Sequence, residues 1–312
     1  MKELRFDGRT AIVTGAGGNP SLGRSHALLL ASRGANVVVN DIGALPEALN
    51  YPGVASAEAV AEEIRAAGGK AVADTHSVAE ADGAAAIVET ALSAFGSVDI
   101  LVNNAGICRV VSFEDMTPAD FEQTIQINLM GTVYMCRAAW PHMKRAGYGR
   151  IVNISSGSMA GIAWQTAYAA SKGGVYSLTR GLASDGEEFG IKANSLVPGA
   201  LTRMVYAAQG EDSVHIAATK DVLKPELVSP TVAFLAHESV PFTGECIESM
   251  GGHVSRYYLA RTPGFDDPDM TVETLAERWP EIMAGTAQGI STHKDSDPRE
   301  WSPKPYRPVI ED

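Results

Sequence analysis

The chain has 312 residues, of which 25 are basic and 37 acidic, so its net charge at pH 7 is −12, while 45% of the residues are hydrophobic. This composition is typical of a globular protein that buries a sizeable core. The acidic balance argues against nucleic acid and anionic membranes as partners, because both are bound through clustered Lys and Arg. The sequence has no signal-peptide pattern and no run of 18 apolar residues, so we expect a cytoplasmic protein without a membrane anchor.

The three cysteines, Cys108, Cys136 and Cys246, lie far apart in the sequence and form no CxxC pair. This spacing indicates neither a disulfide framework nor a metal site. We therefore expect three buried thiols in a reducing compartment.

Seven short, mostly apolar runs recur along the first 250 residues, and few of them alternate with polar residues. Such runs are typical of strands buried on both faces of a parallel sheet. The runs are residues 10–14, 36–40, 70–73, 98–102, 150–154, 191–197 and 245–248. The Ala-rich segments between them show apolar residues at helical spacing over residues 57–67, 82–95, 118–145 and 166–189. We predict an α/β protein with a Rossmann-type, doubly wound, seven-stranded parallel sheet and helices on both faces.

The composition changes near residue 252. The last 60 residues hold 7 of the 16 prolines and 2 of the 4 tryptophans. We therefore expect residues 1–252 to form one domain and residues 253–312 an extension. Its prolines and Trp279 suggest a segment that packs on the domain, on a neighbouring subunit or at the rim of the substrate entrance, rather than an independent fold.

The first predicted strand runs into a glycine-rich segment, and a helix is predicted to begin near Ser25. Glycines let the backbone approach a pyrophosphate, whose charge is stabilised by the N-terminus of the helix. Asp41 ends the second strand 26 residues after Gly15, where an acid accepts hydrogen bonds from ribose hydroxyls. We predict a dinucleotide site whose phosphate turn uses Gly15, Gly17, Ser21, Leu22 and Gly23.

Asp41 also bears on the choice of cofactor. A carboxylate at this position would repel a ribose 2′-phosphate, which favours NAD over NADP. Arg24 argues the other way, because a basic residue beside the phosphate turn can accommodate a 2′-phosphate, but it is equally well explained as a surface residue of the helix. We expect NAD to be the working cofactor and no metal to be needed.

Tyr168 and Lys172 lie four residues apart at the start of a predicted helix and therefore share one face. An isolated tyrosine has a pKa of about 10 and is a poor base at neutral pH. A nearby ammonium group favours the phenolate and lowers that pKa. The pair therefore predicts a general acid/base at Tyr168.

Several motifs now occur together in a fixed order. They are the phosphate turn, Asn103-Asn104-Ala105-Gly106, Asn128 in Ile127-Asn128-Leu129, Ser155-Ser156, Tyr168 with Lys172, and Pro198-Gly199 followed by Thr202. This set resembles the short-chain dehydrogenase/reductase family over about 250 residues. Further stretches, such as 37–41, 137–144, 223–226, 237–239, 269–273 and Trp279, resemble the (3R)-hydroxyacyl-CoA and 17β-hydroxysteroid dehydrogenase domain of multifunctional enzyme type 2, over roughly residues 5–283.

The resemblance implies catalytic roles for four residues. Tyr168 would exchange a proton with the substrate oxygen while hydride moves to or from nicotinamide, and Lys172 would also hold the nicotinamide ribose. Asn128 would hold a water molecule that links Lys172 to solvent. A serine would donate to the substrate oxygen: the usual spacing of 13 residues before the tyrosine gives Ser155, whereas the position at the strand end gives Ser156, which we prefer because loops absorb deletions easily.

The resemblance also implies further cofactor contacts. Asn104, Ala105 and Gly106 would pass under the adenosine and its ribose. Pro198, Gly199 and Thr202 would meet the carboxamide and the phosphates. Where the family often places an Asp near the adenine amine, this chain has Asp74-Thr75-His76-Ser77, and local alignment favours His76 and Ser77 over Asp74. The phosphate turn is two residues longer than usual, so Gly15 and Gly23 are its safest assignments.

The segment between Thr202 and Pro225 would form a lid over the substrate. Apolar residues expected to line the pocket are Met159, Ile162, Trp164, Met204, Val205, Tyr206, Val214 and Ile216. They predict a hydrophobic secondary alcohol or ketone, of steroid, terpenoid or aryl type. The alternative is a (3R)-3-hydroxyacyl-CoA, although the lid has no basic cluster for its phosphates. A non-catalytic dinucleotide sensor and a nucleotide-sugar epimerase are two further alternatives.

Two expectations concern assembly. The helices predicted at 118–145 and 166–189 pair with their symmetry mates in this family, which implies a homo-oligomer, most simply a homotetramer. The chain closes with Val309-Ile310-Glu311-Asp312 and carries no peroxisomal SKL tail, so we expect a stand-alone dehydrogenase.

Overall fold

The computed structural model describes residues 3–43, 56–210, 212–284 and 288–289, and these fall into two compact units. The first unit spans Met1–Arg256 and the second Tyr257–Asp312. The first unit thus reaches four residues beyond the boundary at 252 that the composition suggests.

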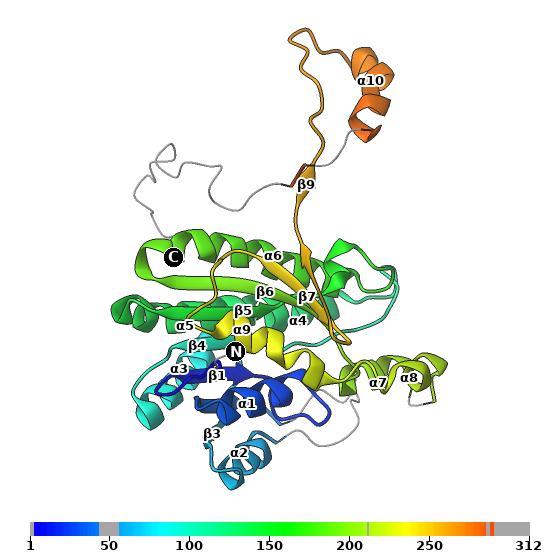
Figure 1. The fold of residues 1–312 in the computed structure, drawn as a ribbon. Helices are drawn as coiled ribbons and strands as arrows, with labels where there is room; N and C mark the ends of the chain where they lie inside the picture. Colours follow the sequence, from blue (N-terminus) through cyan, green and yellow to red (C-terminus); the bar gives the residue numbers. More distant parts are fainter. Residues whose placement is uncertain (1–2, 44–55, 211, 285–287, 290–312) are drawn as a thin grey trace, which may run out of the picture. The chain divides into compact units, whose positions relative to one another are not determined.

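The first unit is built on an eight-stranded sheet with the order β3-β2-β1-β4-β5-β6-β7-β8 (Figure 1). Its strands are β1 (Thr10–Thr14), β2 (Asn36–Asn40), β3 (Lys70–Asp74), β4 (Ile100–Asn103), β5 (Gly149–Ile154), β6 (Ile191–Gly199), β7 (Cys246–Met250) and β8 (His253–Tyr257). Strands β1 to β7 pair in parallel. The order reverses between β1 and β4, and at such a switch point the carboxyl ends of the strands leave room for a dinucleotide.

The prediction of seven strands was wrong by one. Strand β8 follows β7 after Gly251 and Gly252, and so short a connection makes the last pair antiparallel. None of the five β8 residues is buried. An edge strand without an apolar face gives no hydrophobic signal, which is why the sequence placed it in the extension.

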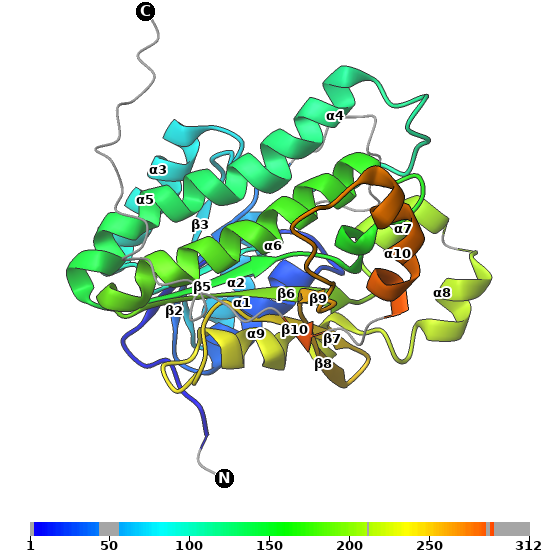
Figure 2. The same cartoon turned by 90° about the horizontal axis from the view of Figure 1, so that it is seen from above.

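Helices cover both faces of the sheet (Figures 1 and 2). The first face carries α1 (Leu22–Ser32), α2 (Ala57–Ala66) and α9 (Ser229–Ala236). The second face carries α3 (Ala81–Phe95), α5 (Gly131–Ala146) and α6 (Thr166–Gly186). Two short helices, α7 (Arg203–Gln209) and α8 (Val214–Thr219), follow β6. The doubly wound α/β class is therefore confirmed.

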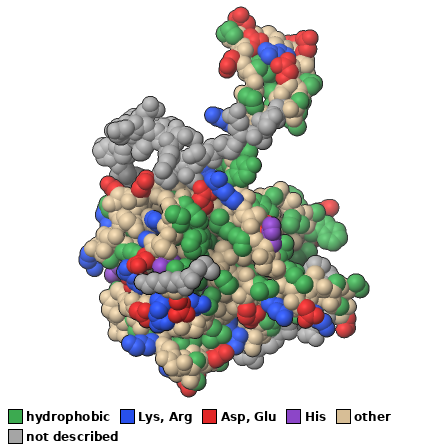
Figure 3. Space-filling model, viewed as in Figure 1, with side chains coloured by type: hydrophobic (Ala, Val, Ile, Leu, Met, Phe, Trp, Pro, Cys, Tyr) green, Lys and Arg blue, Asp and Glu red, His purple; other side chains and the backbone are tan. Residues whose placement is uncertain are grey.

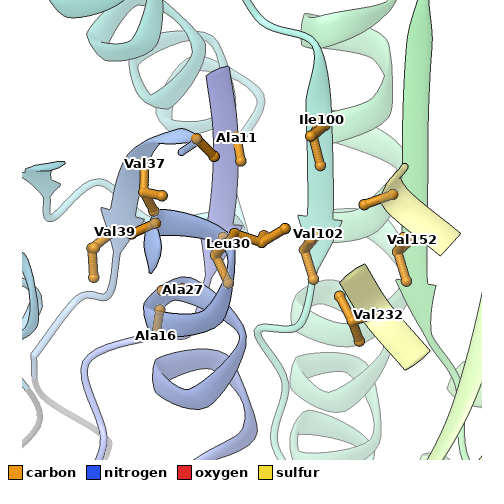
Figure 4. Packing of buried hydrophobic residues seen from close by; sticks show 14 of the residues in the cluster. Ala11, Ala16, Ala27, Leu30, Val37, Val39, Ile100, Val102, Val152 and Val232 are labelled. Carbon is orange, nitrogen blue, oxygen red and sulfur yellow. The ribbon is translucent and has the colours of Figure 1, made fainter. Parts of the chain in front are cut away.

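The strands are apolar on both faces because each face packs under its own helices. Val13 of β1 packs with Leu30 of α1 and Val232 of α9, whereas its neighbour Ile12 packs in the other cluster, under α3 and α5. Figure 4 shows Leu30 pointing from α1 toward the strands, with Val102 close by. The two-residue period of a strand sends successive side chains to opposite layers, so a continuous apolar run fills both cores.

Two predicted helices differ in detail. The segment expected at 118–145 comprises α4 (Pro118–Ile125), a π-helical turn (Gln126–Met130) and α5. The first helix begins at Leu22 rather than near Ser25, because Ser21 caps it: the Ser21 hydroxyl accepts a hydrogen bond from the Arg24 backbone N–H over 3.1 Å.

The second unit contains β9 (Ala260–Arg261), β10 (Gln288–Gly289) and α10 (Val272–Ala284). None of the α10 residues is buried, and Val272, Trp279 and Met283 form exposed apolar positions along the helix. The chain end at 309–312 lies outside the described residues, so the expectation of a stand-alone enzyme is not addressed there.

His26 predicts a measurable acid sensitivity. Its side chain is fully buried between α1 and α9, where Nδ1 lies 2.8 Å from the Ser229 hydroxyl, and burial lowers its pKa to about 3. Below pH 6.5 the His26 side chain therefore binds a proton in the unfolded chain but stays neutral in the folded chain. We expect the free energy of unfolding to fall by about 1.4 kcal/mol per pH unit from this residue alone between pH 6.5 and 4.5.

Urea unfolding at pH 6.5, 5.5 and 4.5 measures this slope. His26→Asn keeps a polar group near Ser229 but cannot titrate, so its curve should be flatter by that amount. His253→Asn, at an exposed position on β8, is the control and should parallel the wild type. Equal slopes for all three proteins would show that His26 is not the group responsible.

Candidate active site

The glycine-rich turn follows β1 at the switch point and lies against the loop after β4. Gly15 has a φ of +63°, and a methyl group there would come 2.8 Å from the Ala105 Cα. The Asn104 amide donates to the carbonyls of Thr14 and Gly15 over 2.9 and 3.0 Å. The turn and the segment Asn104–Gly106, both predicted to contact the cofactor, thus lie side by side, and Gly15 is required both by its backbone conformation and by this contact.

The rest of the turn is rich in glycines, whose backbone is not covered by side chains of their own. A methyl group on Gly23 would come 2.5 Å from the Gly15 carbonyl, so α1 packs directly on the turn. The Ser21 hydroxyl donates to the Gly18 carbonyl over 2.9 Å, and Leu22 is the first residue of α1. The first turn of α1 contains no acidic residue, which suits it to a pyrophosphate. A cradle whose glycines have no room for side chains fits a dinucleotide.

Asp41 lies at the end of β2 beside this cradle. Its two carboxylate oxygens accept hydrogen bonds from the backbone N–H groups of Gly17 (2.8 Å) and Gly43 (2.9 Å). Each oxygen keeps further acceptor capacity for ribose hydroxyls. The guanidinium of Arg24, the one residue that argued for NADP, is held by both oxygens of Glu63.

At the end of β3, Asp74 and His76 take different positions. Asp74 is buried and accepts hydrogen bonds from Asn40, Thr90 and the backbone and ring of His76. Burial would raise the pKa of Asp74, but these hydrogen bonds outweigh it and lower the pKa. The His76 side chain is 55% exposed and faces outward. Asp74, in contrast, accepts hydrogen bonds from residues within the fold. Ser77 accepts from the Ala79 N–H at 3.1 Å.

Tyr168 and Lys172 share one face of α6, as predicted, with the Lys172 Nζ 5.6 Å from the centre of the Tyr168 ring. Lys172 is only 3% exposed, and its Nζ donates to the Ile154 carbonyl at the end of β5 over 2.7 Å. Burial lowers the pKa of Lys172 to about 8. Tyr168 itself is half-buried. The amine is therefore fixed beside the phenol, where its charge stabilises a phenolate.

Asn128 lies in the π-helical turn and is fully buried. Its side chain accepts from the Ile107 N–H (2.8 Å), donates to the Ile107 carbonyl (2.9 Å) and donates to the Ser171 hydroxyl (3.1 Å). Ser171 in turn donates to the Tyr168 carbonyl over 2.7 Å. Asn128 therefore ties the loop after β4 to the turn of α6 that carries Tyr168, while its water-holding role stays a prediction. Ser171, which the sequence reasoning missed, completes this connection.

The two adjacent serines differ in their surroundings. Ser155 is 1% exposed, and its hydroxyl donates to the Lys172 carbonyl over 2.9 Å. Ser156 is only partly buried, and its hydroxyl accepts from the Ser158 N–H over 3.2 Å as the cap of a short 3₁₀ helix. Ser155 is thus used within the fold, and Ser156 is the more accessible of the two.

The predicted residues Pro198, Gly199 and Thr202 lie at and just beyond the carboxyl end of β6. Strand β6 includes Pro198 and Gly199, and Thr202 precedes the first residue of α7. Among the lid residues, Ile216 is buried but Val214 is 85% exposed, so Val214 does not line a pocket here. Arg203 was missed: its guanidinium lies against Gly18 of the phosphate turn. Only its place directly after Thr202 could have indicated it.

Cys108 also lies near the site, since its thiol interacts with Lys172, and burial raises its pKa to about 11. The three cysteines form no disulfide, and Cys136 and Cys246 are buried. Over the described residues, no group of three or more His, Cys, Asp or Glu is placed to bind a metal ion. The search of those same residues finds no helix long and apolar enough to cross a membrane.

Comparison with known proteins agrees with this geometry. The model of the short chain dehydrogenase family matches residues 9–212. Peroxisomal multifunctional enzyme type 2 of Drosophila melanogaster is 40% identical over 287 residues, which cover 90% of this chain but 46% of that protein. The chain thus spans less than half the length of this relative.

Two solved structures are similar over most of this chain. A short chain dehydrogenase from Mycobacterium avium superposes with a TM-score of 0.76 at 33% identity, covering 92% of this chain and 99% of that one. A 7α-hydroxysteroid dehydrogenase, complexed with NADH and 7-oxo glycochenodeoxycholic acid, gives a TM-score of 0.70 at 31% identity, covering 81% and 98%. The chain therefore belongs to the short-chain dehydrogenase/reductase family and is an oxidoreductase of that family.

Proposed function

We propose that this protein is an NAD-dependent oxidoreductase that interconverts a hydrophobic secondary alcohol and its ketone. The observation that carries the proposal is the fixed pair on α6: the buried Lys172 amine, held by the Ile154 carbonyl, lies next to the half-buried Tyr168 phenol. Burying an amine costs solvation free energy. Such a group is typical of a catalytic site, and cofactor binding alone does not require it.

The proposed cofactor is NAD, which would supply the hydride acceptor or donor when bound. The residues proposed to hold it are those of the phosphate turn, Asp41, His76 and Ser77, Asn104–Gly106 and the segment from Pro198 to Thr202. Asp41 beside the ribose position disfavours a 2′-phosphate, and Arg24 is engaged by Glu63. The related 7α-hydroxysteroid dehydrogenase was solved with NADH, which supports the same assignment.

In alcohol oxidation, the Tyr168 phenolate would accept the hydroxyl proton of the substrate. Lys172 keeps that phenolate favourable because its charge is fixed in a site largely shielded from water. Ser156 would donate to the substrate oxygen and orient it, and the same donor stabilises the negative charge that develops there. In ketone reduction the proton moves the other way.

Exposed apolar side chains near the site support a hydrophobic substrate. Val110 and Phe113 follow β4, Ile162 and Trp164 precede α6, and all four are 48–71% exposed. The two loops are joined by a hydrogen bond from the Val111 N–H to the Trp164 carbonyl, 2.8 Å. Figure 3 shows several hydrophobic side chains, in green, on the surface of this unit. The alternative substrate is a (3R)-3-hydroxyacyl-CoA, given the similarity to multifunctional enzyme type 2.

A spectrophotometric screen tests the proposal. NADH formation at 340 nm would be followed with cyclic, aryl and steroid alcohols and with a (3R)-3-hydroxyacyl-CoA, using NAD and NADP in parallel. We expect turnover of a hydrophobic alcohol, with a higher kcat/KM for NAD than for NADP. A preference for the acyl-CoA would establish the alternative, and a preference for NADP would overturn the cofactor assignment. Tight NADH binding without turnover of any substrate would favour a sensor.

The serine assignment gives a separate prediction. Ser156→Ala should lower kcat by about 10²- to 10³-fold, since it removes a preorganised donor to the reacting oxygen. Ser155→Ala should cost about 1 kcal/mol of stability, because a buried hydrogen bond is lost, but leave kcat within a few-fold. Steady-state kinetics and urea unfolding of both variants measure this. Loss of activity in Ser155→Ala alone would reverse the assignment.

We also propose a homo-oligomer, most simply a tetramer. A surface groove between α5 and α6, lined by Val133, Trp140, Leu178 and Leu182 among others, offers an apolar face for pairing of these helices.

The extension from residue 253, with its exposed α10 positions, is proposed to pack on the domain or a neighbouring subunit. Light scattering that gives a monomer mass would contradict the assembly. A cytoplasmic location is proposed because the three cysteines form no disulfide.

A further inference from the structure

The first residue of α7 reaches the phosphate turn by two routes. The Arg203 backbone N–H donates to the Pro20 carbonyl over 3.2 Å. Its guanidinium fills the space where a side chain on Gly18 would stand: a methyl group there would lie 2.8 Å from Nε, 2.9 Å from Nη2 and 3.1 Å from Cζ of Arg203. Gly18 does not have a positive φ, so the feature that distinguishes it is the space beside its backbone, which the Arg203 guanidinium occupies.

The guanidinium therefore lies at the part of the turn that precedes α1. The helix itself begins at Leu22, and its first turn carries no acidic residue. A dinucleotide pyrophosphate brings two negative charges to such a turn. A planar guanidinium can donate two parallel hydrogen bonds to phosphate oxygens, which an ammonium group cannot.

We propose that Arg203 is a cofactor-binding residue that donates to the pyrophosphate of the dinucleotide, with Gly18 providing the space for its side chain. This inference rests on the proposed NAD-dependent function. Arg203 would add a positive charge to a pyrophosphate site whose other proposed donors are backbone N–H groups and hydroxyls. The assignment also means that the segment after β6 contributes to the cofactor site with a side chain as well as with its backbone.

Binding of NADH, followed by its fluorescence, tests the proposal on the full chain without requiring a substrate. Arg203→Gln should weaken NADH binding by about 10- to 100-fold, the range expected for a charged hydrogen bond. Arg203→Lys keeps the charge but not the fork, so its loss should be intermediate. Arg24→Gln is the matched control: it removes the same charge next to the same turn, but from a guanidinium held by Glu63, and should change binding less than twofold.

Competition with fragments separates a phosphate contact from a general disturbance. In Arg203→Gln, ADP-ribose should lose the same factor as NADH, whereas adenosine, which has no phosphate, should bind as it does to the wild type. Equal NADH affinity in wild type and Arg203→Gln would overturn the proposal, and so would equal losses for ADP-ribose and adenosine. If the wild type itself fails to bind NADH, the proposed function fails first, and that result is recognised without any variant.

Discussion

Tyr168→Phe is expected to lower kcat for alcohol oxidation by at least 10²-fold and up to about 10⁴-fold, while NADH binding changes little. The variant keeps the ring beside Lys172 but removes the only group proposed to exchange a proton with the substrate oxygen. Because the proton transfer is lost but the cofactor contacts remain, the effect should fall on kcat rather than on the affinity for the cofactor.

Tyr176→Phe provides the matched control. Tyr176 lies on the same helix two turns later, is 6% exposed and has its hydroxyl 3.3 Å from the Arg180 guanidinium. Removing this hydroxyl changes the same atoms on the same element, so any general effect on α6 should appear in both variants. We expect Tyr176→Phe to retain kcat within about twofold. Comparable activity of the two variants would exclude Tyr168 as the acid/base.

Lys172→Met is the second large expected effect, a loss of about 10²-fold or more in kcat. Without the ammonium group the phenolate of Tyr168 is no longer stabilised, so less of the reactive form is present at neutral pH. In the wild type, the Lys172 pKa of about 8 means that the charge is lost as the pH rises through 8. The kcat/KM for NAD of the wild type should therefore decline above pH 8, and this limb should be absent from Lys172→Met.

The same substitution should leave the fold intact. Because burial lowers the Lys172 pKa, holding its charge inside costs folding free energy at pH 7, and stability rises as the pH passes from 8 toward the unfolded value. Methionine removes that cost but leaves the Ile154 carbonyl without its donor, a loss of about 1–3 kcal/mol. Thermal unfolding should thus give a similar Tm for both proteins. A wild-type pH profile retained in Lys172→Met would contradict this role for Lys172.

The parts of the site that were predictable are those encoded by short spacings. Gly15 follows β1 and Gly23 is the second residue of α1, while Tyr168 and Lys172 are one helical turn apart, so local geometry alone brings each group together. The buried strands were equally predictable, because a strand between two cores needs apolar residues at successive positions along its centre. Strand β8 has no such requirement, and it was missed.

What could not be predicted depends on contacts between distant segments. The side chain of Asn128 forms hydrogen bonds with Ile107 and Ser171. No pattern around Ile127-Asn128-Leu129 indicates these partners. Local alignment favoured His76 over Asp74, but it could not show that Asp74 is buried and bonded to Asn40 and Thr90, whereas the His76 side chain is exposed. Such assignments follow from which hydrogen-bond partners a side chain meets in the folded protein.

Arg203 illustrates the same limit for a charged residue. In the sequence it follows Thr202 and lies 185 positions after Gly18, so neither periodicity nor a motif connects the two. The path of β6 to the carboxyl edge of the sheet and the return of α7 over the phosphate turn place them in contact. A contact between two segments so far apart in the sequence can be recognised only after the fold is known.

Transfer of deuterium from substrate to cofactor tests the central claim most directly. The best alcohol of the screen would be prepared with deuterium on its carbinol carbon and incubated with NAD, and the reduced cofactor examined by mass spectrometry. We predict NADH carrying one deuterium per ketone formed, and at least about 10²-fold less labelled NADH in the same time with Tyr168→Phe at the same enzyme concentration. Ketone that forms without labelled NADH would contradict direct hydride transfer between a secondary alcohol and the cofactor.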